Sequence, residues 1–241
     1  HRRFFYETNV GAGLPIIDTL QNMFKSGDRL VAFSGIMSGS LSYIFGRLDE
    51  GTLFSEAVLE AREKGFTEPD PRDDLSGMDV ARKALSIARE AGYPLELQDV
   101  AISQVFPAEF DSSGTTEEFL KKLPQLDGYF SRLMERLRSE GKALRMAAEI
   151  NSAAEISVAD VSVETGKVAA GKCRVGCIEV GQDHPLWAVK GGENAFVINT
   201  KRYNPLPLVV RGYGAGAGVT AAGVFADILR TVSWNHLSEK E

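Results

Sequence analysis

The chain has 241 residues, of which 44% are hydrophobic and 25% are charged, an ordinary globular composition with enough length for a sizeable core. Its net charge of −6 argues against a nucleic-acid-binding protein, which normally carries a basic face. No apolar run approaches the roughly 20 residues of a membrane-spanning helix, and the opening HRRFFYETNV lacks the apolar region of a signal peptide.

The first half of the chain is predicted to be mainly helical. Residues 2–10, rich in aromatic and β-branched side chains, predict a strand, and GAGLP predicts the turn after it. Apolar residues at helical spacing follow, and Ser55 is expected to cap the third helix. The predicted helices cover residues 16–26, 38–49, 53–64, 76–92, 115–124 and 125–140, with one further strand over 28–37.

The second half of the chain is predicted to form a sheet, because the apolar pattern changes after residue 141. The predicted strands cover residues 142–151, 155–164, 172–181, 195–203 and 206–214, and a glycine loop then leads into a helix over 219–233. Short turns between the first of these strands favour antiparallel pairing. We therefore predict an α+β fold, with helices packed on a largely antiparallel or mixed sheet.

The two cysteines, Cys173 and Cys177, fall on one face of a predicted strand. We interpret them as free buried thiols rather than a disulfide, and a metal site would need two further ligands nearby. Free thiols suit a reducing compartment, so we expect a cytoplasmic protein, or a plastid protein if the source is a plant. Arg145 and Arg174 lie on predicted strands and could face a partner subunit.

The stretch GFTEPDPRDDLSGMDVARK, residues 65–83, has a structural interpretation. Pro69 and Pro71 hold a loop extended before a helix that begins near residues 73–76. Acidic side chains at the start of a helix are favourable because the helix dipole is positive there. Ser76 followed by Asp79 resembles a capping box, so these residues can be explained without chemistry.

The same stretch also has a functional interpretation. Asp79 and Lys83 lie one turn apart on a predicted helix face, and a lysine beside a carboxylate can relay protons. Glu68 and Asp74 flank the same space and could hold the ammonium group of an amino acid. Spacing leaves both interpretations open.

The resemblance of several sequence motifs to a known protein family favours the functional interpretation over the structural one. AREKGFTEPDPRDDLSGMDVARK closely resembles the signature of homoserine dehydrogenases. ETNVGAGLPII, GIMSGSLSYIF and RGYGAGAGVTAAGVFADILR are similar to three other segments of that family, so the resemblance spans almost the whole chain. TNVGAGLP and PLPLVVRGYGAG further resemble the dehydrogenase part of bifunctional aspartokinase–homoserine dehydrogenases.

The resemblance implies an NAD(P)-dependent oxidoreductase that interconverts L-homoserine and L-aspartate 4-semialdehyde in threonine and methionine biosynthesis, and a homodimer. It implies that Lys83 transfers the proton and that Asp79 positions Lys83. Phe66 stands where some members have tyrosine, which removes any contact made by a phenol there. The implied substrate-binding residues are Glu68, Asp74, Gly39 and Ser40, and the implied cofactor-binding residues are Gly65 and Gly216.

The resemblance also implies a site for a monovalent cation such as sodium. A glycine-bearing turn can aim backbone carbonyls inward, and Glu7 adds a carboxylate; such hard oxygen ligands suit this kind of ion. The alternative is a plain turn with Glu7 exposed. The implied ligand residues are Glu7, Val10, Ala12 and Leu14.

The phosphate-binding loop that would open a Rossmann domain is not found in the sequence. We therefore expect a partial enzyme that is inactive alone. Residues 1–14 are interpreted as the end of a strand and turn leading from the cofactor domain, residues 15–210 as the substrate-binding and dimerisation domain, and residues 211–241 as a glycine loop and helix returning to the cofactor domain. The alternatives are a non-catalytic dimerisation module and a different hydroxy- or amino-acid oxidoreductase.

Overall fold

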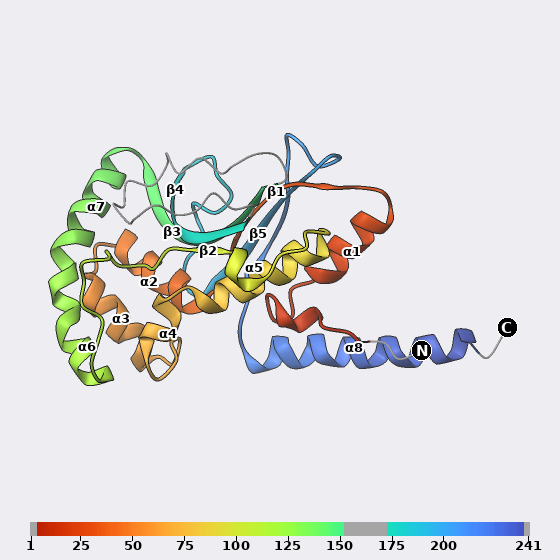
Figure 1. Cartoon of the computed structure of the whole chain (residues 1–241), viewed down its shortest axis with the longest axis horizontal. Helices are drawn as coiled ribbons and strands as arrows, with labels where there is room; N and C mark the ends of the chain where they lie inside the picture. Colours follow the sequence, from red (N-terminus) through yellow and green to blue (C-terminus); the bar gives the residue numbers. More distant parts are fainter. Residues whose placement is uncertain (1–3, 152–172, 239–241) are drawn as a thin grey trace.

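The computed structural model describes residues 4–151 and 173–238, and a six-stranded sheet forms the centre of this part (Figure 1). The strand order is β2–β4–β3–β1–β5–β6, and all neighbours run antiparallel except the parallel pair β2 and β4. The predicted α+β class with a mixed sheet is confirmed. The strands are β1 (Leu30–Ile36), β2 (Ala101–Ile102), β3 (Lys142–Asn151), β4 (Cys173–Gly181), β5 (Glu193–Thr200) and β6 (Leu208–Tyr213).

Helices cover one face of the sheet and bury the larger core against it (Figure 1). Phe54 and Phe130 stack with ring centroids 4.1 Å apart, which joins two of these helices. None of the helices in the described part is long and apolar enough to cross a membrane. The helices are α1 (Ile17–Lys25), α2 (Gly39–Asp49), α3 (Phe54–Glu63), α4 (Pro71–Leu75), α5 (Met78–Glu90), α6 (Thr116–Lys122), α7 (Asp127–Ser139) and α8 (Ala217–Ser238), with 3-10 turns η1 (Glu7–Asn9), η2 (Leu97–Asp99) and η3 (Leu123–Leu126).

The opposite face of the sheet carries a smaller apolar cluster, where Leu186 and Val189 pack on strand residues. Arg145 is buried near this cluster. Its guanidinium donates to the carbonyls of Leu144 and Leu186 and pairs with Asp49 at 2.7 Å. The expectation that Arg145 faces a partner subunit is therefore wrong, because its donors are satisfied within the chain.

Arg174 likewise has a partner within the chain. It pairs with Glu149, which lies directly opposite it on β3. Cys173 and Cys177 are buried free thiols on β4, as predicted. Their burial raises both thiol pKa values to about 12.

The N-terminal strand expected over residues 2–10 is wrong for the residues that the structure describes. Residues 7–9 form η1, and Gly11 and Ala12 then both adopt positive φ angles, which reverses the chain. The Glu7 carboxylate accepts hydrogen bonds from the backbone amides of Ile17 and Asp18, both at 2.8 Å. The Glu7 carboxylate thus supplies hydrogen-bond acceptors to backbone amides in the first turn of α1, which have no acceptor within the helix. Glu7 can reach these amides only because the chain folds back before α1, which a continuous strand would not allow.

Two predicted helix caps are also wrong. The N-cap of α5 is Gly77, in the left-handed conformation, and Ser76 instead donates to the Asp73 carbonyl. The N-cap of α3 is Leu53. The amide and hydroxyl of Ser55 donate to the Asp127 carboxylate of α7, at 2.8 and 2.7 Å, so a distant side chain caps this helix.

Helix α8 extends along the side of the molecule away from α2, α3 and α7 (Figure 1). It packs on the residues around η1: a Cβ at Gly13 would meet the Val219 carbonyl at 2.4 Å. Apolar side chains of α8 are exposed, as expected, and their packing on a cofactor domain stays a prediction. The exposed side chains are Val219, Val224, Phe225, Ile228, Leu229 and Val232.

Two further predictions concern the second half of the chain. The predicted domain boundary between residues 210 and 211 falls inside β6. The predicted strand 155–164 lies outside the described residues.

Candidate active site

The end of β1 and the start of α2 form a tight turn. Ser38 is the N-cap of α2, and its hydroxyl accepts from the Leu41 amide at 3.2 Å and lies 2.8 Å from the Ser40 hydroxyl. Gly39 begins the helix, and a Cβ there would lie 3.3 Å from the Gly192 carbonyl oxygen. The predicted residues Gly39 and Ser40 therefore lie in the first turn of a helix whose dipole favours an anion.

Lys83 reaches from α5 to this strand end. Its ammonium lies 2.7 Å from an Asp79 carboxylate oxygen and donates to the Met37 carbonyl at 3.1 Å. The Lys83 side chain is 24% exposed and the Asp79 side chain is 59% exposed, so the pair lies at the surface of the molecule. The region formed by Gly39, Ser40, Glu68, Asp74, Asp79 and Lys83 is called the rim below. Val80 and Ala84 of α5 are buried, which leaves the face with Asp79 and Lys83 at the edge of the core.

Asp74 joins the elements around this rim. Its two carboxylate oxygens accept from the Ser40 hydroxyl at 2.6 Å and from the Glu68 amide at 2.9 Å. Burial raises the pKa of Asp74 above its usual value, those two hydrogen bonds act in the opposite direction, and the charge of Asp79 adds to the rise. Asp74 thus connects α4 to both α2 and the loop that follows α3.

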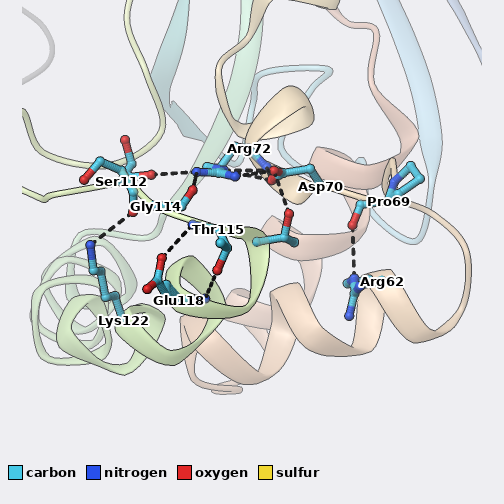
Figure 2. Close-up of polar contacts among 11 residues, drawn as sticks. Arg62, Pro69, Asp70, Arg72, Ser112, Gly114, Thr115, Glu118 and Lys122 are labelled. Carbon is cyan, nitrogen blue, oxygen red and sulfur yellow. Dashed lines mark hydrogen bonds and ion pairs between the residues drawn. The ribbon is translucent and has the colours of Figure 1, made fainter.

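A braced loop carries Glu68, whose side chain is exposed. On one side, the Arg62 guanidinium donates to the Pro69 carbonyl at 3.2 Å. On the other, the Arg72 guanidinium bonds the Asp70 carboxylate and the carbonyls of Ser112 and Gly114, as Figure 2 shows.

The bond from Arg72 is the main reason why the pKa of Asp70 falls from 3.8 to about 2. The prediction of an extended loop up to residues 73–76 is wrong in part. Asp70 caps the short helix α4, which Pro71 begins.

Phe66 stacks on Tyr43 of α2, with ring centroids 4.7 Å apart. A phenol is therefore present near the position where some family members have tyrosine. The Tyr43 hydroxyl donates to Glu60 at 3.1 Å and accepts from Lys64 at 2.5 Å. This phenol is tied to neighbours on α3 and its C-terminal cap rather than directed at Lys83.

The two predicted cofactor-binding glycines lie on separate segments. Gly65 follows α3 with φ of +72°, and a Cβ there would meet open space. Gly216 has φ of +123° in the loop before α8, and its carbonyl accepts from the Thr220 amide at 3.1 Å. Both positions need the conformational freedom of glycine, but Gly216 is tied to α8 and Gly65 to α3.

The residues of the predicted cation site lie in the turn after η1. Val10 and Ala12 are buried, and Ala12 adopts a positive φ of 53°. Glu7 is buried rather than exposed, its pKa is raised by burial, and its carboxylate is occupied by α1 amides. In the part of the chain that the structure describes, no cluster of three or more His, Cys, Asp and Glu side chains could hold a metal.

Sequence reasoning missed the Met37 carbonyl and the Ser38 hydroxyl as parts of this arrangement. A backbone carbonyl leaves no signal in side-chain spacing. Ser38 does leave one, because a serine between a strand and a helix is a typical N-cap.

Comparison with known proteins identifies the family of the chain. The family model described as homoserine dehydrogenase matches residues 15–229, which include every segment of the rim. The chain belongs to the homoserine dehydrogenase family. The predicted resemblance is therefore confirmed.

Curated relatives of the family include long bifunctional proteins. The chain is 53% identical over 230 residues to a bifunctional aspartokinase/homoserine dehydrogenase of Haemophilus influenzae, covering 95% of the chain and 26% of that protein. It is 52% identical over 232 residues to one of Buchnera aphidicola, with 96% and 26% covered. A homoserine dehydrogenase of Schizosaccharomyces pombe is 41% identical, with 95% of the chain and 58% of that protein covered. The chain thus spans about a quarter of the bifunctional relatives.

Solved structures share the fold of this chain. A Candida auris protein of unknown function superposes with a TM-score of 0.81 at 39% identity, covering 94% of the chain and 60% of that protein. A hyperthermophilic archaeal homoserine dehydrogenase in complex with NADPH has a TM-score of 0.63 at 25% identity, covering 94% of the chain and 54% of that protein.

Proposed function

We propose that the gene product carrying this chain interconverts L-homoserine and L-aspartate 4-semialdehyde with a nicotinamide nucleotide, and that the rim around Lys83 is its substrate site. The observation that carries this proposal is the Lys83 ammonium, held between the Asp79 carboxylate and the Met37 carbonyl at the end of β1. It lies on elements that also carry Ser40 and Asp74, within a chain of the homoserine dehydrogenase family.

Lys83 moves the proton of the reaction. In the oxidation of homoserine, the neutral amine of Lys83 takes the proton of the substrate hydroxyl as the C–H bond on the same carbon breaks. In the reduction, its ammonium returns that proton to the carbonyl oxygen of the aldehyde. The Met37 carbonyl and Asp79 orient the ammonium, and the exposed side of Asp79 offers a route for the proton to solvent.

The remaining rim residues hold the amino acid. The amides at the start of α2 include donors that the helix itself leaves without an acceptor, so Gly39 and Ser40 suit the substrate carboxylate. Glu68 is an exposed carboxylate at the rim and suits the substrate ammonium. Asp74 uses both oxygens to hold the Ser40 hydroxyl and the Glu68 amide, so its contribution is to position these two residues.

The cofactor is proposed to be NADPH or NADP⁺, since an archaeal relative with a similar fold is described in complex with NADPH. Bound nicotinamide would supply the hydride acceptor or donor. Gly65 and Gly216 are the positions proposed to lie near it, because neither carries a side chain that would hinder close approach. A sodium-like cation is proposed in the turn of Val10, Ala12 and Leu14; with the Glu7 carboxylate occupied, backbone carbonyls would have to hold it.

A homodimer is proposed on the family resemblance. Among the described strands, β6 lies at a sheet edge and exposes Val209 and Tyr213, which supports pairing along that side. Elution volume with light scattering would test it. A cytoplasmic location is proposed for a bacterial or fungal source, and plant relatives are described as chloroplastic.

Lys83→Met tests the catalytic proposal in the purified gene product, with homoserine-dependent change in nicotinamide absorbance as the assay. We expect kcat to fall about 10²–10⁴-fold while the NADPH dissociation constant is unchanged, because the proton-transferring group is lost and the cofactor contacts are kept. Lys83→Arg should also be inactive, since a guanidinium does not release its proton.

Lys122→Met is the matched control, because Lys122 also pairs with an aspartate, Asp111, at 2.6 Å but lies on the far side of the braced loop. It should leave kcat unchanged. Wild-type protein without homoserine-dependent turnover, or Lys83→Met with activity within tenfold of wild type, would refute the proposal.

A further inference from the structure

Asn194 is a fully buried carboxamide whose nitrogen and oxygen both lack a hydrogen-bond partner in the described structure. It is the second residue of β5 and points to the same face as Phe196 and Ile198, the face that helices cover. Buried amides are nearly always paired, because an unpaired one loses its bonds to water without replacement. The Asn194 carboxamide therefore has a donor and an acceptor that no described group uses.

Asn194 lies beside residues of the proposed substrate site. The β1–β5 register pairs Ile36 with Ala195, which places Asn194 beside Met37, whose carbonyl accepts from Lys83. Asn194 also follows Gly192, whose carbonyl lies 3.3 Å from the Cβ position of Gly39. Asn194 thus lies next to the strand end that carries the proposed chemistry.

A glycine loop covers Asn194 from the other side. A Cβ at Gly214 would lie 1.9 Å from the Asn194 Nδ2 atom and 2.0 Å from its Cγ atom. Gly214 opens the segment 214–216 between β6 and α8, which includes the proposed cofactor-binding Gly216. The carboxamide is therefore packed directly against the backbone of this loop while bonding none of its peptide groups.

We propose that Asn194 is a positioning residue for the nicotinamide end of the nucleotide, acting through the 214–216 loop; this inference rests on the proposed function. Binding of the nicotinamide shifts the loop, and its peptide N–H and C=O groups then pair with the Asn194 carboxamide. A carboxamide offers both donors and an acceptor, and glycines allow the peptides to reorient. The new hydrogen bonds form only in the bound state, so they favour binding.

Asn194→Leu tests this proposal, because leucine has a similar volume and no polar group. Calorimetry on the gene product carrying this chain would compare NADPH with 2′-phospho-ADP-ribose, which lacks nicotinamide. We expect the NADPH dissociation constant to rise roughly tenfold and that of the analogue to stay unchanged. The unfolding midpoint without ligand should be equal or higher, because the unpaired amide is gone.

Gly214→Ala provides a second, independent variant, since its methyl group would displace the Asn194 carboxamide. It should weaken NADPH binding as well, and it serves as the test if Asn194→Leu does not fold. Thr200→Val is the matched control on the same strand: Thr200 is buried but bonded to Asp28 at 2.7 Å. It should lower the unfolding midpoint and leave NADPH affinity unchanged.

A lower midpoint for Asn194→Leu with unchanged NADPH affinity would overturn the inference, since that pattern is the one expected of a purely structural residue. Equal losses for NADPH and the analogue would overturn it too, because the nicotinamide end would not be involved. If wild-type protein neither binds NADPH nor oxidises homoserine, the proposed function fails. If wild type does both and the two variants match it, only the role of Asn194 fails.

Discussion

Asp70→Asn should destabilise the braced loop in a pH-dependent way. The Asp70 carboxylate accepts from the Arg72 guanidinium at 2.9 Å and from the Thr116 hydroxyl at 3.0 Å, and both Asp70 and Arg72 are only 26% exposed (Figure 2). These bonds lower the pKa of Asp70 from 3.8 to about 2. At roughly 1.4 kcal/mol per pKa unit, the shift corresponds to about 2 kcal/mol of stability.

The direction follows from linkage. The folded protein binds the Asp70 proton more weakly than the unfolded chain, so the stabilisation is fully present above pH 3.8 and is lost as pH falls toward 2. Urea denaturation of the gene product should show Asp70→Asn about 2 kcal/mol less stable than wild type at neutral pH, with the difference shrinking through that window.

Asp111→Asn is the control, because the Asp111 carboxylate also pairs with a basic side chain, that of Lys122, but is 66% exposed. Its effect should be much smaller than that of Asp70→Asn. A difference between wild type and Asp70→Asn that is the same at neutral pH and near pH 2 would refute the reasoning, because the ionised carboxylate would then contribute nothing specific.

Two further substitutions test the packing on the two faces of the sheet. Arg145→Met should lower the free energy of unfolding by about 3–5 kcal/mol, because it leaves Asp49 and buried carbonyls without a donor. Urea denaturation measures this loss, and a loss no larger than that of Arg47→Met, whose side chain is partly exposed, would contradict the prediction. Gly77→Ala should cost about 1–2 kcal/mol, because Gly77 has φ of +73° and a Cβ would lie 2.7 Å from the Met146 Cε atom; an unchanged thermal midpoint would show that the chain adapts freely there.

The spacing of apolar residues in the sequence correctly predicts most of the helices and strands that bury one face in the core. The helices α1, α2, α3, α5 and α7 and the strands β1, β3, β4 and β6 all lie within the predicted segments, whereas β5 begins two residues before its predicted segment of 195–203. Failures occurred where a backbone is held by partners distant in sequence. Residues 4–10 look like a strand, yet the Glu7 carboxylate turns back to bond the first amides of α1. The two-residue strand β2 is too short to leave a periodic signal.

In the candidate site, too, contacts between residues near in sequence could be predicted, and contacts between distant residues could not. Asp79 and Lys83 could be paired from the sequence because one helical turn separates them, and the structure places their charged atoms 2.7 Å apart. Asp74 could be named, but its partners could not, since Ser40 lies 34 positions away and is brought near only by folding. The sequence does not predict α4, because two prolines close together favour an extended loop, whereas Pro71 also suits the first turn of a helix once Asp70 caps it. Under the proposed function, the contacts of Arg72 would fix where Glu68 meets the substrate. Arg72 touches neither Lys83 nor Asp79 in the described contacts, so its substitution should change KM for homoserine more than kcat in the nicotinamide absorbance assay.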